Sequence, residues 1–211
     1  MRARITFSKT GALRYIGHLD LQTLWERAAR RAGLPLAYSH GFHPQAKINF
    51  ASALPLGFSS RAEVMDIRLQ SELELSELPK RLRDALPAGI GILDVQSVDE
   101  AEPALQTQVS SAEYEVMLAE QVDIAEVQRG IDVVLAAPTL RRERRNKTYD
   151  LRPLIDELRV LHASDGDAAT VIFMRLSARE GATGRPEEVL AELGIQGNST
   201  RIERSRLIFQ R

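Results

Sequence analysis

The period of the hydrophobic pattern changes repeatedly in the first hundred residues, and the order of these changes restricts the fold. Apolar residues that alternate indicate a half-buried strand, whereas spacing of three and four indicates a helix. The pattern predicts strand, helix, strand, strand, helix, strand over Arg2–Phe7, Leu19–Ala32, Leu36–Ala51 (interrupted at Gly41 and Pro44), Glu63–Leu69, Leu75–Leu86 and Ile90–Val98. This βαββαβ order is that of the ferredoxin-like unit, an antiparallel sheet with helices packed on one face.

The hydrophobic pattern of the second half predicts a similar but less regular order of strands and helices. We expect strands at Glu113–Leu118, Thr170–Ser177 and Ile202–Phe209, helices at Ile124–Leu135 and Pro186–Leu193, and two extended pieces within Thr139–Leu154. The predicted fold class is therefore α+β, with two ferredoxin-like units and antiparallel sheets. The polar segment 101–110 contains Pro103 and reads as a linker between domains 1–100 and 111–211.

Composition excludes several kinds of chemistry. The 211 residues include no cysteine, so this chain offers no disulfide, no thiolate zinc site and no cysteine-held iron–sulfur cluster. We expect no cofactor in this chain. No apolar run reaches the roughly 20 residues of a membrane helix, and the N-terminus lacks the apolar core of a signal peptide. A cytoplasmic protein without membrane contact is the expectation.

Charge is segregated along the chain, although the net charge is only −1. Residues 1–61 carry a net +7, residues 62–140 a net −11 and residues 141–211 a net +3. This suggests a positive face formed by the first segment and joined by the basic stretch near residue 141. Alternatively, the acidic middle segment pairs with the basic ends.

Three of the four histidines fall between residues 18 and 43. His18 begins the first predicted helix, where backbone N–H groups favour a phosphate or carboxylate, and His43 follows His40 in a turn. The candidate anion-binding residues are Arg14, Gly17, His18, His43 and Lys47, with His18 and His43 as candidate acid–base groups. Alternatively, His18 caps the helix structurally and His40 is an exposed turn residue. We expect no metal, because the spacing matches none of the usual ligand patterns.

The segment from Leu140 to Pro153 is an arginine-rich ribbon. Guanidinium groups suit phosphate oxygens, so this ribbon is a candidate RNA contact. Its candidate residues are Arg141, Arg142, Arg144, Arg145, Lys147 and Arg152. A solvated strand that pairs with the acidic segment is the alternative, since the whole chain has 24 Arg and only 4 Lys.

Several segments together resemble one bacterial family, a domain of unknown function known for its linkage to radical SAM proteins. They are Arg14–Asp20, Ser39–Ile48, Ala53–Gly57 with Glu63, Arg142–Arg144 and Tyr149–Ile155. The resemblance implies a radical SAM protein as partner and a place near RNA processing. It implies no activity that can be carried over.

These observations favour an accessory protein rather than an enzyme, one that presents tRNA or rRNA to a radical SAM enzyme for modification or processing. Two alternatives stay open. One is a stand-alone RNA-processing enzyme with His18 as general base. The other is a protein-interaction module whose acidic middle segment docks a radical SAM partner without nucleic acid.

Overall fold

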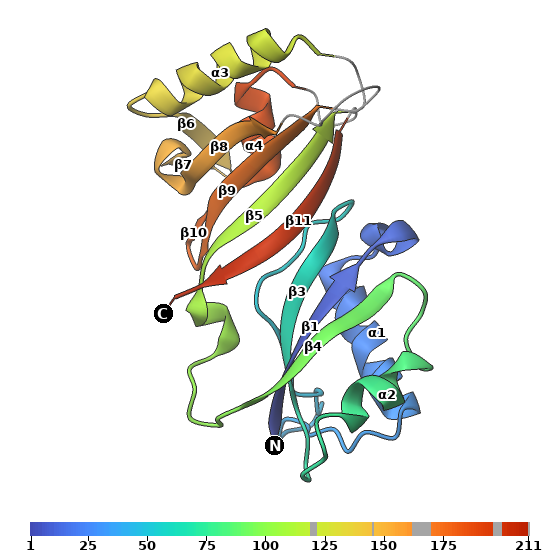
Figure 1. The fold of residues 1–211 in the computed structure, drawn as a ribbon. Coiled ribbons are helices and arrows are strands. Elements are labelled where there is room, and N and C mark those ends of the chain that lie inside the picture. Colours follow the sequence, from blue (N-terminus) through green and yellow to red (C-terminus); the bar gives the residue numbers. More distant parts are fainter. Residues whose placement is uncertain (119–121, 145, 162–169, 196–199, 211) are drawn as a thin grey trace. The chain divides into compact units, whose positions relative to one another are not determined.

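The computed structural model describes residues 1–118, 122–144, 146–161, 170–195 and 200–210 (Figure 1). The chain divides into two compact units, Met1–Val109 and Ser110–Arg211. Both combine helices with strands that pair in antiparallel fashion, which confirms the predicted α+β class. Within the described residues, no helix is both long enough and apolar enough to cross a membrane.

The first unit contains four strands and two α-helices in the predicted order. They are β1 Arg2–Lys9, the 3-10 helix η1 Gly11–Tyr15, α1 His18–Arg31, β2 Ile48–Phe50, β3 Ser59–Arg68, α2 Glu77–Arg83, β4 Ile90–Val98 and the 3-10 helix η2 Leu105–Gln108. The strands lie in the order β4-β1-β3-β2, and each neighbouring pair is antiparallel. The order βαββαβ is thus present in this unit.

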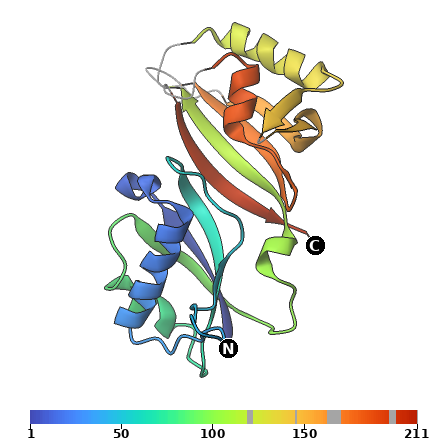
Figure 2. The same cartoon turned by 180° about the vertical axis from the view of Figure 1, so that it is seen from behind.

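Both helices of the first unit pack on the same face of its sheet, and Figure 2 shows α1 in front of the strands. Alternate residues of β1 (Ala3, Ile5 and Phe7) are fully buried and share one core with residues of α1 and α2. Trp25 of α1 meets Phe7 edge-on, with ring centroids 4.9 Å apart. The alternating pattern of β1 therefore encodes which face is covered.

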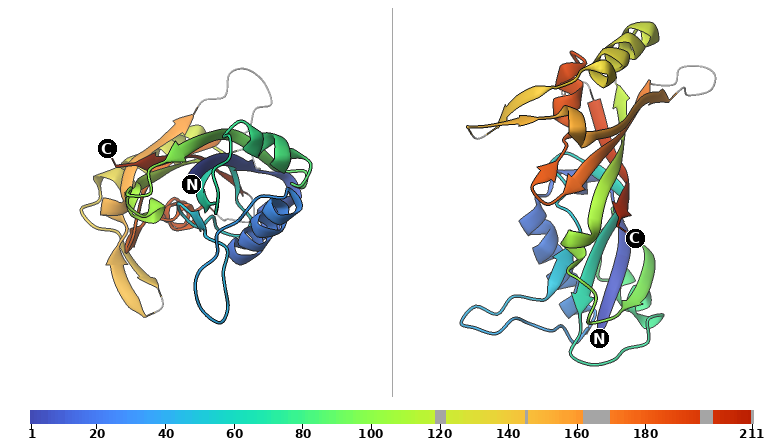
Figure 3. Two further views of the ribbon diagram at one scale, coloured as in Figure 1. Left: turned by 90° about the horizontal axis from the view of Figure 1, so that it is seen from below. Right: turned by 90° about the vertical axis from the view of Figure 1, so that its left-hand side faces the viewer.

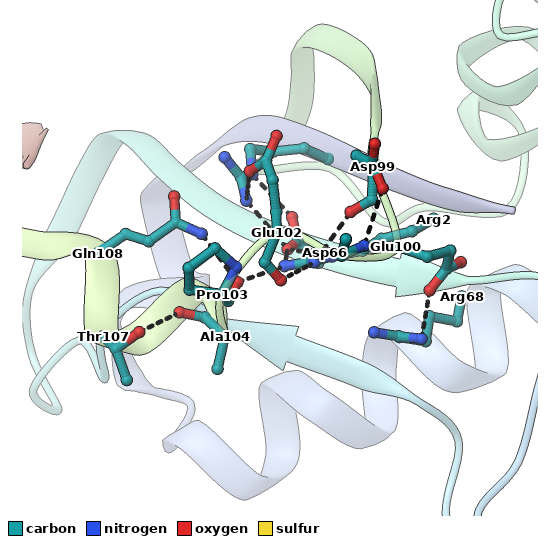
Figure 4. Close-up of polar contacts among 12 residues, drawn as sticks. Arg2, Asp66, Arg68, Asp99, Glu100, Glu102, Pro103, Ala104, Thr107 and Gln108 are labelled. Carbon is teal, nitrogen blue, oxygen red and sulfur yellow. Dashed lines mark hydrogen bonds and ion pairs between the residues drawn. The ribbon is translucent and has the colours of Figure 1, made fainter. Parts of the chain in front are cut away.

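The opposite side of β1 carries a buried charge cluster. The Arg2 side chain is only 4% exposed, and its guanidinium donates to the Asp66 carboxylate at 2.9 Å and 2.6 Å. The same group donates to the carbonyls of Asp99, Glu102 and Pro103 (Figure 4). Arg2 therefore belongs to the interior of the unit and not to a positive working face, because all its donors are directed inward.

These contacts hold the segment that sequence patterning assigned to a linker, 101–110. Leu105 and Val109 in it are buried, each 1% exposed, and Leu105–Gln108 forms η2. The division between the two units falls after Val109, at the end of this segment. A polar composition does not reveal the two apolar residues that attach such a segment to its unit.

The second unit contains β5 Val109–Leu118, α3 Ile124–Ala136, β6 Arg141–Arg144, β7 Lys147–Asp150, the 3-10 helix η3 Arg152–Leu154, β8 Ile155–Leu161, β9 Val171–Arg179, β10 Ala182–Thr183, α4 Pro186–Glu192 and β11 Thr200–Phe209. Strand β5 lies between β9 and β11, and β8 and β10 also pair with β9. Strands β6 and β7 form a separate hairpin, which confirms the two predicted extended pieces.

Candidate functional site

The start of α1 places Arg14, Gly17 and His18 at one end of the first unit. Gly17 precedes the helix in an extended conformation, and its carbonyl accepts from the Leu21 N–H at 2.9 Å. The His18 ring is half-buried and packs edge-on against Phe50, with ring centroids 5.2 Å apart. This aromatic contact gives His18 a packing role in addition to any ligand contact.

Arg14 is held beside an aromatic ring at the same end. Its guanidinium carbon lies 4.6 Å from the centroid of the Tyr15 ring, and a guanidinium N–H donates to the Tyr15 hydroxyl. Its carbonyl accepts from the Gly57 N–H at 2.8 Å, which attaches the loop before β3 to η1. The contact with the ring does not neutralise the positive charge of Arg14, because the ring carries no net charge.

His40 and His43 lie in a loop that projects from the first unit (Figure 3, right-hand view, lower left). The loop is closed by a bridge between Tyr38 and Ala46 and by the Ser39 N–H, which donates to the Gln45 carbonyl at 2.9 Å. Both histidines are exposed, and Phe42 at the tip is 101% exposed. Lys47 follows the loop, is half-buried, and its N–H donates to the Ala37 carbonyl.

The structure does not bring His18 and His43 together. His18 is the first residue of the 14-residue α1, and the loop follows the other end of that helix. Such a helix is about 21 Å long. Leu36, just before the loop, bridges to Leu69 beside Met1 at the start of β1, whereas His18 lies beyond the end of β1. The five predicted anion-binding residues therefore divide into two groups, one with Arg14, Gly17 and His18 and the other with His43 and Lys47.

The arginine ribbon forms the β6–β7 hairpin of the second unit. Arg142 pairs with Tyr149 and Arg144 with Lys147, so these four side chains share one face of the hairpin. Arg141 is exposed on the other face, beside Asp150. Arg145 lies outside the described residues.

Two of the predicted RNA-binding arginines have structural contacts. The Arg142 guanidinium donates to the Glu188 carbonyl at 3.1 Å, and its Nε lies 3.0 Å from Glu192 Oε1, so it attaches the hairpin to α4. The Arg152 guanidinium donates to the carbonyls of Leu135 and Ile155, both at 3.1 Å. The sequence pattern cannot distinguish these two arginines from arginines that face solvent. Their partners are backbone carbonyl groups or residues that are distant in the sequence.

Two further cations of the ribbon, Arg144 and Lys147, line a groove of about 630 Å³. Its wall is formed by Arg144, Lys147, Tyr149, Asp150, Leu154, Gly181, Ala182 and Thr183. In the part of the chain that the structure describes, neither Arg144 nor Lys147 forms an ion pair with a carboxylate. Asp150 Oδ1 already accepts from the N–H groups of Leu140 at 2.7 Å and Arg152 at 3.0 Å. The groove therefore offers two cations without ion-pair partners among the described residues, beside the Asp150 carboxylate.

Tyr149 is a part of this groove that sequence reasoning did not select. Its hydroxyl donates to the Glu188 carboxylate. Burial raises the pKa of Tyr149 to about 12, and the neighbouring Glu188 contributes in the same direction. The sequence did contain a signal for Tyr149: it lies two residues after Lys147 in a predicted extended segment, and residues at this spacing share a face of a strand. Nothing in the sequence points to residues 181–183, which come from the distant β9–β10 hairpin.

Metal ligands do not gather in the described residues: no group of three or more His, Asp or Glu side chains is placed to hold an ion there. Together, the fold and the groove define an α+β protein with antiparallel sheets and a cationic groove. The chain belongs to the family described as "Uncharacterized protein conserved in bacteria (DUF2344)", whose model matches residues 2–186. This confirms the predicted membership of a bacterial family of unknown function. No curated protein matches significantly.

Solved structures show a likeness in fold at 11% sequence identity. One is titled "Crystal Structure of a Cbf5-Nop10-Gar1 Complex", with a TM-score of 0.51, and covers 97% of this chain and 48% of that chain. A second is an H/ACA RNP bound to a substrate RNA containing 2'-deoxyuridine, with a TM-score of 0.48, 97% of this chain and 47% of that one. This chain therefore spans about half the length of the chains it resembles.

Proposed function

We propose that this protein is an accessory RNA-binding protein that works with a radical SAM enzyme in the modification or processing of tRNA or rRNA. The observation that carries the proposal is the groove in which Arg144 and Lys147 face an open volume without carboxylate partners among the described residues. Phosphate is the anion that an RNA presents repeatedly, and arginine binds it through paired N–H donors.

The remainder of the groove suits a nucleic acid as well. Leu154 and Ala182 contribute apolar surface beside the two cations, and the Tyr149 ring adds an aromatic side chain of the type on which bases stack. Backbone positioning by cations and stacking on aromatic rings are the two contacts that sequence-tolerant RNA-binding proteins combine. Recognition of one particular base is not part of the proposal.

The radical SAM partner is supported by the family resemblance of the motifs at Arg14–Asp20 and Ser39–Ile48. A radical SAM enzyme requires a cysteine-held iron–sulfur cluster, and this chain has no cysteine. In this proposal the partner therefore supplies the chemistry, and this chain supplies contacts to the RNA. The cytoplasm is the compartment that such a task requires.

We also propose that each unit is a variant of the ferredoxin-like unit. The antiparallel order β4-β1-β3-β2 supports this for the first unit. In the second unit, β8, β9, β5 and β11 lie side by side in that order, with α3 and α4 in the corresponding connections. The β6–β7 hairpin is then an insertion between α3 and β8, and it carries the groove.

RNA binding is tested by fluorescence anisotropy with a labelled single-stranded RNA of about 20 nucleotides, titrated at several salt concentrations. Each phosphate contact on a single strand contributes about 0.7 to the slope of log affinity against log salt. The variant Arg144→Ala/Lys147→Ala should bind more weakly, with a slope shallower by about 1.4.

The matched control is Lys80→Ala/Arg81→Ala, which removes the same charge from exposed positions on α2 where both residues lie near Glu77. It should leave the slope unchanged. Wild-type binding that is independent of salt, or equal losses in the two double variants, would contradict the groove as the RNA site.

The partner is tested by mixing the purified protein with a purified radical SAM enzyme of the same bacterium after nuclease treatment. A complex that forms only when RNA is restored supports the accessory role. A complex that never forms contradicts the partnership, whatever the RNA result.

A protein-interaction module is the second candidate function, and one observation favours it. Tyr15, Leu19 and Leu56 are large apolar residues that are 61%, 76% and 65% exposed near the start of α1. Apolar residues that gather on a surface mark contact sites. If Leu19→Ser abolishes the complex with the radical SAM enzyme and leaves RNA affinity intact, this end of α1 is the protein contact.

The hypothesis of a stand-alone enzyme predicts that the purified protein cleaves RNA and that His18→Ala removes this cleavage.

A further inference from the structure

The exposed face of α1 carries three arginines near the end of the helix. Leu21, Trp25, Ala28 and Ala29 form the buried face of this helix. Arg27, Arg30 and Arg31 are all exposed on the other side and are spaced by three and four residues. Residues at this spacing are neighbours on a helix surface, about 5–6 Å apart at Cβ. The helix therefore concentrates three positive charges over little more than one turn.

These charges have no carboxylate partner in the described portion of the chain. Glu26 lies four residues before Arg30, the usual spacing for a helical ion pair, yet its carboxylate accepts from the Tyr38 hydroxyl at 3.5 Å. No ion pair or hydrogen bond of the three guanidinium groups is present among the described residues. The three guanidinium groups are therefore available to a ligand.

The helix dipole explains only part of the arrangement. Positive side chains near a helix C-terminus are favourable, but the effect is confined to the last turn. Arg30 and Arg31 lie in that turn, and Arg27 does not. The cost of placing a third guanidinium beside two others is therefore not offset by the dipole, and it would be relieved by an anion that binds among them.

The surface around the three arginines is open to solvent. Arg27, Arg30 and Arg31 alone line a shallow, open depression of about 370 Å³. Arg27 and Arg31 also line a groove of about 460 Å³ between α1 and the segment after α2, whose acidic members are Asp20 and Asp84. Asp20 lies seven residues before Arg27, which is about 10 Å along the helix axis. The three-arginine depression is thus free of acidic lining.

We propose that Arg27, Arg30 and Arg31 form a second phosphate-contact surface, which binds the backbone of the same RNA that the β6–β7 groove binds. This inference rests on the proposed function, and it adds contacts on the first unit to those on the second. Guanidinium groups bind phosphate oxygens through paired N–H donors and carry no base specificity in this role.

The test uses the full chain and a labelled single-stranded RNA of about 20 nucleotides. In Arg27→Gln/Arg30→Gln/Arg31→Gln the slope of log affinity against log salt should become shallower by about 2, since three contacts contribute about 0.7 each. Between 50 and 200 mM salt, the ratio of wild-type to variant affinity should then change roughly 18-fold. Glutamine keeps high helix propensity, and circular dichroism checks the fold.

Two comparisons make the result decisive. The variant Arg27→Lys/Arg30→Lys/Arg31→Lys keeps the charge and should keep the slope, and Lys80→Gln/Arg81→Gln removes charge elsewhere and should also keep it. If the glutamine variant retains the wild-type slope while Arg144→Ala/Lys147→Ala loses affinity, the α1 surface is overturned and the proposed function stands. If the wild-type protein binds no RNA, both are overturned.

Discussion

At the scale of single residues, the Arg2 guanidinium is closely constrained by its partners. Removing one partner of a buried ion pair leaves an uncompensated charge, which costs more than the pair itself contributes. Arg2 and Asp66 are both nearly inaccessible, with side chains 4% and 2% exposed. Asp66 also accepts from Arg4, whose pKa is raised first by this hydrogen bond.

We therefore expect Asp66→Asn to lower the free energy of unfolding by about 3–5 kcal/mol, measured by urea denaturation. The control is Glu77→Gln, which breaks an exposed pair with Lys80 and should cost less than about 1 kcal/mol. Equal costs for the two variants would mean that the three backbone carbonyls alone suffice to hold Arg2.

The ionisation of Tyr149 leads to a prediction about how stability depends on pH. Its pKa is raised to about 12 in the folded state, first by burial and then by Glu188, above the ordinary value of 10.0. A raised pKa means that folding favours the protonated phenol, so this contribution to stability is complete below pH 10 and is lost as the pH rises towards 12. An ultraviolet titration should show a late-ionising tyrosine that is lost in Tyr149→Phe. Stability of the wild type relative to that variant should fall between pH 10 and 12.

At the scale of elements, the sequence predicted regular strands and helices well and missed an irregular strand. Strand β8, Ile155–Leu161, has a bulge between Ile155 and Glu157. The extra residue puts the buried side chains Ile155 and Leu158 three positions apart, so the alternation that identifies a strand is absent. Likewise, the extended segment from Leu36 to Tyr38 forms only isolated bridges, and the second strand is confined to Ile48–Phe50.

The turn of the β6–β7 hairpin supports a second prediction about the groove. Asn146 has φ of 61°, in the left-handed region where a β-branched residue is strained by about 1–2 kcal/mol. Asn146 precedes Lys147, which pairs with Arg144 across the hairpin. We expect Asn146→Val to weaken RNA binding in the anisotropy assay, and Asn146→Gly, which tolerates positive φ, to leave it unchanged. Equal affinity in both variants would show that the turn geometry does not matter.

At the scale of the whole molecule, the candidate contacts are distributed over both units. Composition and spacing alone selected Arg144 and Lys147 as candidate residues, and the structure places both at one groove. It could not predict that His18 and His43 lie at opposite ends of α1, because the distance between them depends on how the chain returns after a helix. It also could not distinguish the arginines that bind carbonyls inside the units, Arg2 and Arg152, from exposed ones.

The number of cations on the two proposed surfaces sets an upper limit on how steeply the RNA affinity falls with salt. Arg27, Arg30, Arg31, Arg144 and Lys147 supply five cations, which correspond to a slope no steeper than about −3.5 for a single strand. We expect the wild-type slope, measured from anisotropy titrations at five or more salt concentrations, to stay within this limit. A steeper slope would show that further basic residues, such as Arg14 or Arg141, also contact phosphate.

The loop with Phe42 at its tip has a practical consequence. Both ends of the loop are fastened by the hydrogen bond between Ser39 and Gln45 and by the Tyr38–Ala46 bridge, whereas its tip packs against nothing in the first unit. Extra residues at such a tip add little closure entropy and disturb no core. A fluorophore or affinity tag inserted beside Gly41 would therefore report on this molecule while leaving its sheet, its helices and the proposed cationic surfaces as they are.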